Sequence, residues 1–165
     1  MSDQHHPGRE RLRSSLVLPE WIEGGLLGGL AVAAVFLVRD SLLGEPLHTP
    51  SVLGVLLFQG LEAARSTTSA PGAAAAYHAI HFSVWVVVGL VGAQVMRRAE
   101  DEPRLWWLPL ASLALALLVL VALEGWVRET GLTRPRLWLG GAAGLAVLGG
   151  FLLWRHPGAL RRPAS

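Results

Sequence analysis

The chain contains a continuous apolar run, residues 73–96, that is long enough to cross a lipid bilayer. As a helix rising about 1.5 Å per residue it would measure about 36 Å, more than the roughly 30 Å hydrocarbon core of a membrane. Three further apolar runs cover residues 22–38, 105–123 and 137–154. Backbone amides find no water inside a bilayer, so continuous runs of this kind are expected to be helical. The sequence therefore predicts four transmembrane helices.

The composition supports this class of protein. Of 165 residues, 52% are hydrophobic and only 16% are charged, whereas roughly 25% are charged in a soluble domain. We predict a single all-α integral membrane domain over residues 20–155, with polar tails at 1–19 and 156–165. Apolar residues continue past a cleavage-like Ala-x-Ala pattern at 31–33, so the first run is interpreted as an uncleaved span and not as a signal peptide.

The connection between the first two spans, residues 39–72, contains a shorter apolar segment at 51–64. Thr49 and Pro50 precede it and suit an N-cap and a first helical position. A segment of this length cannot cross a bilayer as a helix. Unpaired backbone groups at bilayer depth cost several kcal/mol each, so we expect an interfacial or shallow re-entrant helix.

The distribution of the basic residues predicts the orientation of the chain in the membrane. All 14 basic residues are arginines. One side of the predicted topology holds nine of them: Arg9, Arg11, Arg13, Arg97, Arg98, Arg104, Arg155, Arg161 and Arg162. The other side holds five: Arg39, Arg65, Arg128, Arg134 and Arg136. The positive-inside rule then places both termini in the cytoplasm. The Ala-, Leu-, Gly- and Arg-rich composition without lysine suggests a bacterial inner-membrane protein, and the small net charge of +2 excludes an evident nucleic-acid surface.

Two of the predicted spans carry G-x-x-x-G pairs, which let helix backbones approach closely in lipid. The glycines concerned are Gly24, Gly25, Gly28, Gly29, Gly140 and Gly144. We expect these faces to pack within the monomer, against a membrane protein partner, or in a homo-oligomer. A phosphate-binding loop is excluded, since no strand precedes the glycines and no Lys-Ser or Lys-Thr follows them.

The second span carries His78 and His81, the only histidines in any of the four runs. Their spacing places them on one helix face, in the outer half of the bundle, and we expect that face to point inward toward the end of the third span. Tyr77 is adjacent, and Glu124 ends the third span on the same outer side. Tyr77, His78, His81 and Glu124 are therefore the candidate cofactor-binding residues.

Several roles are open to this group. Neutral imidazoles that satisfy their nitrogens by hydrogen bonds would be purely structural. A metal ion would use His78, His81 and a carboxylate such as Glu124 or Glu62. A quinone would use the histidines and Tyr77. Haem would need a further axial ligand, because two histidines on one helix face cannot bind opposite sides of one iron. A proton relay or transporter is the remaining alternative, although no inverted repeat is visible between the two halves of the chain.

The sequence also excludes some chemistry. It contains no cysteine, so disulfides, thiol redox reactions and cysteine-bound metals are ruled out. It has no nucleophile elbow and no H-E-x-x-H motif. The sequence thus favours a non-enzymatic accessory or interaction subunit of the membrane that packs through its glycine-rich faces. The alternative is a redox, quinone-binding or metal-binding membrane protein with its site at His78 and His81.

Overall fold

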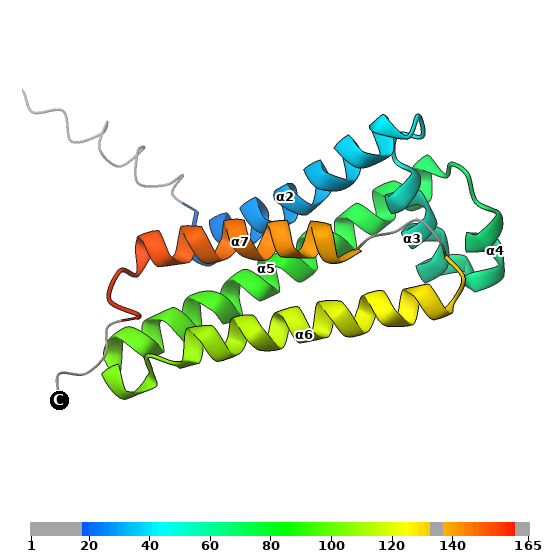
Figure 1. Cartoon of the computed structure of the whole chain (residues 1–165). Helices are drawn as coiled ribbons and strands as arrows, with labels where there is room; N and C mark the ends of the chain where they lie inside the picture. The colour runs from blue at the N-terminus through cyan, green and yellow to red at the C-terminus, as the bar shows by residue number, and fades with distance from the viewer. Residues whose placement is uncertain (1–17, 133–136, 161–165) are drawn as a thin grey trace, which may run out of the picture.

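The computed structural model describes residues 18–132 and 137–160, and each regular element in those ranges is helical (Figure 1). The elements are α2 (Glu20–Leu42), α3 (His48–Gln59), α4 (Leu61–Ser66), α5 (Pro71–Asp101), η2 (Pro103–Leu105), α6 (Leu108–Glu129) and α7 (Leu137–Arg155). Among them α2, α5, α6 and α7 are long and apolar enough to cross a membrane. The prediction of an all-helical chain with four helices of membrane-spanning length is confirmed.

The four long helices run in alternating directions along the bundle (Figure 1). One end, called here the basal end, holds the first turn of α2 and the last turns of α5 and α7, while α3 and α4 gather at the opposite end. Helix α2 makes its most extensive contacts with α5 and α7, and α6 contacts α5 and α7 much less. Only 6% of the membrane-length segment of α6 is buried, against 22 to 33% for the other three. The bundle is a three-helix core with a peripheral fourth helix.

The core lies where α2, α5 and α7 meet, and Trp85 of α5 is at its centre. A Cβ atom on Gly28 would stand 2.7 Å from the Trp85 ring, and one on Gly144 would stand 2.4 Å from it. The indole therefore occupies space that only glycine leaves open on the two neighbouring helices. All six glycines of the predicted packing faces meet atoms of this same chain, so these faces build the core of the bundle itself.

The helix bounds differ from the predicted spans mainly in α6. We expected a loop after residue 123, but α6 continues to Glu129. The chain turns at Gly131, whose φ of 77° lies in the left-handed region that glycine adopts without a steric penalty. Helix α5 extends beyond its apolar run at both ends, because a helix can continue with charged residues once it has left the hydrocarbon.

The short helix expected at 51–64 is replaced by two helices, α3 and α4, that meet at Gly60. Gly60 has a φ of 91° and a ψ of 178°, which a residue with a side chain rarely adopts. Helix α3 also begins earlier than expected and buries its first half against the start of α5. A Cβ atom on Gly54 would lie 2.1 Å from the carbonyl oxygen of Ala73, so α3 is docked directly on the bundle.

Residues 156–160, the first part of the predicted polar C-terminal tail, pack against the bundle. His156 is 7% exposed and Ala159 is fully buried. Residues 161–165, and residues 1–17 of the predicted N-terminal tail, lie outside the described ranges. The packed part of the C-terminal segment closes the basal end of the bundle.

Candidate functional site

The structure groups Tyr77, His78 and His81 on the first half of α5. The rings of Tyr77 and His81 are stacked with centroids 5.5 Å apart, and Tyr77 meets His78 edge-on at 5.8 Å. Phe82 and Trp85 continue this aromatic series along the helix. Three of the four candidate residues therefore form one aromatic cluster.

His81 is buried and joins two helices. Its Nε2 donates a hydrogen bond to the carbonyl oxygen of Gly29 on α2, at 3.1 Å. A carbonyl oxygen can only accept, so Nε2 carries the proton and the ring is held in one tautomer. The imidazole of His81 points inward, as expected, but its hydrogen-bond partner lies on α2 and not at the end of the third span.

His78 bonds within its own helix. Its Nδ1 donates to the carbonyl oxygen of Ala74, one turn earlier, at 2.7 Å. In the neutral ring this leaves Nε2 as the nitrogen that can accept a hydrogen bond or bind a metal. His78 is only half-buried, so its role in packing is weaker than that of His81.

Glu124 serves a different part of the molecule. Its Oε2 accepts a hydrogen bond of 2.8 Å from the backbone amide of Leu137, the first residue of α7. A carboxylate at this position satisfies an amide that has no partner within the helix and lies favourably at the positive end of the helix dipole. Across the described ranges, no group of three or more histidine, aspartate or glutamate side chains is arranged to hold a metal. The expected set of His78, His81 and Glu124 is therefore not assembled there.

Two ion pairs at the basal end, not predicted from the sequence, tie α2 to both other core helices. Glu20 pairs with Arg97 at the end of α5, and Glu23 accepts a hydrogen bond from Arg155 at the end of α7, at 3.0 Å. Both carboxylates lie in the first turn of α2, and both arginines lie near helix ends, as the helix dipoles favour. Because the helix directions alternate, these four positions lie at one end of the bundle. The predicted topology alone was therefore enough to indicate that the carboxylates and the arginines lie near each other.

His156 extends this network. Its Nδ1 lies 2.7 Å from Oε2 of Glu100, and its Nε2 lies 3.3 Å from Oε2 of Glu20. The other oxygen of Glu100 accepts a hydrogen bond from the amide of Gly158 at 3.2 Å. Glu100 of α5 therefore fastens the segment that follows α7.

A second buried polar contact connects α2 to α3 at the other end. Asp40, only 1% exposed, accepts hydrogen bonds from the amide of Thr49 at 2.6 Å and from its hydroxyl at 2.8 Å. The N-cap residue of α3, Leu47, has no side-chain acceptor, so Asp40 supplies the cap from a neighbouring helix. Asp40, His81 and Glu124 are thus each engaged in a hydrogen bond between two helices.

Comparison with known proteins adds no relative: no family model matches the chain, and no curated protein and no solved structure matches it significantly.

Proposed function

We propose that this protein is a non-enzymatic accessory subunit of a membrane complex that binds its partner through α6. The observation that carries the proposal is the contrast in burial, 6% for the α6 segment against 22 to 33% for the other three spans. The glycine-rich faces are filled by the chain's own side chains. A partner helix would therefore dock on α6 and not on the glycines.

Two further features of α6 favour a protein partner. Its outward face carries exposed alanines, among them Ala111, Ala114 and Ala122, and small residues let a second helix approach closely in lipid. An apolar cavity of about 190 Å³ lies between α6 and the helices α5 and α7, with Leu110 and Leu153 among its lining residues. Helix α6 is therefore loosely held by its own bundle.

Site-specific photocrosslinking in intact cells tests this proposal. A photoreactive residue in place of Leu118, which is 64% exposed on α6, should give one discrete protein adduct. The same residue in place of Leu30, 58% exposed on α2, is the matched control and should give none. Ala114→Trp should abolish the adduct by blocking close approach. Lipid adducts alone at position 118, or a protein adduct unaffected by Ala114→Trp, would contradict the proposal.

The proposed location is the bacterial inner membrane, with both termini in the cytoplasm. The arginine asymmetry supports it. Because the chain has no cysteine, single cysteines can report the topology. Ser66→Cys should react with an impermeant maleimide in intact cells, and Glu102→Cys only after permeabilisation. Both positions are exposed. Labelling of Glu102→Cys in intact cells, and of Ser66→Cys only after permeabilisation, would show the opposite orientation.

A second candidate function is quinone binding at the aromatic cluster. It is favoured by the ring group of Tyr77, His78 and His81, in which Nε2 of His78 could accept a hydrogen bond from a quinol hydroxyl. Solvent extraction of the purified protein should then yield a quinone that the His78→Leu variant lacks. A quinone-free, metal-free and colourless folded protein would contradict the redox and metal-binding alternatives and leave the accessory role standing.

A further inference from the structure

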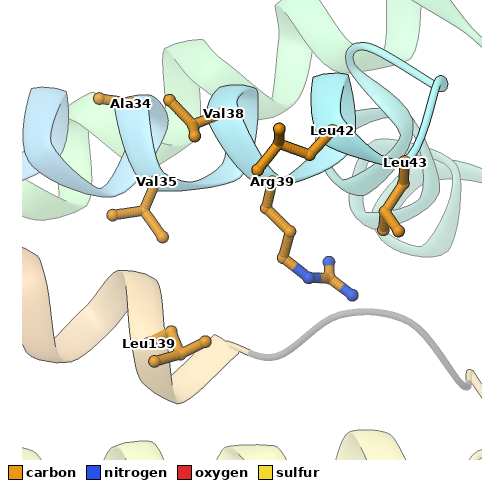
Figure 2. A pocket seen from close by; sticks show the side chains of 7 residues that line it. All are labelled: Ala34, Val35, Val38, Arg39, Leu42, Leu43 and Leu139. Atoms are coloured by element: carbon orange, nitrogen blue, oxygen red, sulfur yellow. The ribbon is translucent and has the colours of Figure 1, made fainter.

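A groove of about 680 Å³ opens between the second half of α2 and the start of α7. Figure 2 shows its seven lining residues, which are Ala34, Val35, Val38, Arg39, Leu42, Leu43 and Leu139. Six of them are apolar and one is an arginine. Exposed apolar side chains are abundant here, because Val38 is 60% and Leu42 is 82% exposed. The groove therefore combines a long apolar wall with a single cationic group.

The cationic group lies at one end of the wall. Arg39 is in the last turn of α2, and its side chain extends from the helix into the groove (Figure 2). Its NH1 lies 3.5 Å from both Oδ1 of Asp40 and the hydroxyl of Thr49. A guanidinium has five N–H donors in a planar fork, so it can bind a phosphate while keeping contacts of this kind.

The layout of the groove matches the two parts of a phospholipid. From Ala34 to Leu43 the lining residues cover about 13 Å along α2 at 1.5 Å per residue. Arg39 lies near the end of the span, where lipid headgroups are found, and the wall at Ala34 and Val35 extends toward the middle of the bilayer. A guanidinium at this depth can attract the phosphate of an anionic headgroup.

We propose that the groove binds one anionic phospholipid, with its phosphate against Arg39 and an acyl chain along α2. This site is independent of the proposed partner face, because none of its lining residues belongs to α6. A zwitterionic lipid would bind less well, since its ammonium group offsets the phosphate charge that Arg39 attracts.

Native mass spectrometry of the full-length purified protein, titrated with phosphatidylglycerol or phosphatidylcholine, tests this assignment. The wild type should retain one phosphatidylglycerol, with about tenfold preference over phosphatidylcholine. One charge-assisted hydrogen bond contributes a preference of about this size. Arg39→Gln should remove the preference for the anionic lipid. Ala34→Phe should fill the groove from an exposed position and weaken retention of either lipid. Leu37→Phe, which places the same phenylalanine side chain on α2 outside the groove, should behave like the wild type.

Three outcomes would overturn the assignment. The first is equal retention of the two lipids by the wild type. The second is wild-type retention of phosphatidylglycerol by a folded Ala34→Phe variant, which decides the matter even where Arg39→Gln fails to fold. The third is a change of oligomeric state in Ala34→Phe with unchanged lipid adducts, which would assign the groove to a protein contact.

Discussion

His81 of α5 donates a hydrogen bond to the carbonyl oxygen of Gly29 of α2, at 3.1 Å. The contact joins the two most conspicuous features of the sequence, a histidine within an apolar run and a glycine-rich helix. Glycine at position 29 lets α5 come close enough for the imidazole to reach the backbone: a Cβ there would lie 2.9 Å from the Phe82 ring. The main structural role of His81 is therefore to link α5 to α2.

This link predicts unequal effects of the two histidines on stability. His81→Leu should lower the free energy of unfolding by about 0.6 kcal/mol, and at most by about 2 kcal/mol, the range for hydrogen bonds between membrane helices. His78→Leu should have a smaller effect, because His78 bonds only Ala74 of its own helix. Thermal unfolding in detergent measures both. An equal or larger effect of His78→Leu would show that the interhelical bond is not the stabilising one.

The close helix contacts predict that substitution by alanine destabilises some glycine positions strongly and others not at all. Gly25→Ala would place a Cβ atom 2.5 Å from the carbonyl oxygen of Trp85 and 2.7 Å from Cα of Val86. These are backbone atoms that cannot rotate away, so the variant should lose about 1 to 3 kcal/mol of stability or more. Gly150→Ala is the matched control on α7, where nothing lies within 4 Å. It should be neutral or gain up to about 1 kcal/mol from helix propensity. Similar unfolding temperatures for the two variants would contradict this packing.

The helix content and the four long helices could be predicted from the sequence. The length of an apolar run is a local property, and a run long enough to cross a bilayer must be helical there. It also predicted close packing at the glycines. It could not assign their neighbours, since that depends on which helices lie side by side. Trp85 shows the difficulty: its pockets come from Gly28 and Gly144, which are far from it and from each other in the sequence.

The candidate site was only partly predictable for the same reason. Tyr77, His78 and His81 share one helix, so their grouping follows from spacing alone. Glu124 lies on another helix, and its carboxylate caps α7, a use that competes with ligand binding. His156 was overlooked because a residue just beyond the last span resembles an exposed tail, whereas the ends of three helices meet around it.

The cap between α2 and α3 predicts that a single side chain holds α3 in place. Asp40→Ala removes both acceptors of Thr49, so the first turn of α3 should open and stability should fall by about 1 to 2 kcal/mol. Hydrogen exchange at the Thr49 amide should rise accordingly. Asp101→Ala, at an exposed helix end, is the control and should leave α3 unchanged. Unaltered exchange in Asp40→Ala would mean that packing of Gly54 on Ala73 alone secures α3.

The basal network predicts that Glu100 keeps the C-terminal segment closed. Glu100 receives hydrogen bonds from His156 at 2.7 Å and from the amide of Gly158 at 3.2 Å, and neutralising it should weaken both. Glu100→Gln should therefore expose the bond after Arg155 to trypsin, with cleavage several times faster for a loss of about 1 kcal/mol. Glu102→Gln, two residues along and exposed, removes the same charge and should cleave at the wild-type rate. High salt should speed cleavage of the wild type more than of Glu100→Gln, because partly exposed ion pairs are screened. Equal rates in all three proteins would mean that the burial of Ala159, and not the ion pairs, closes this end of the bundle.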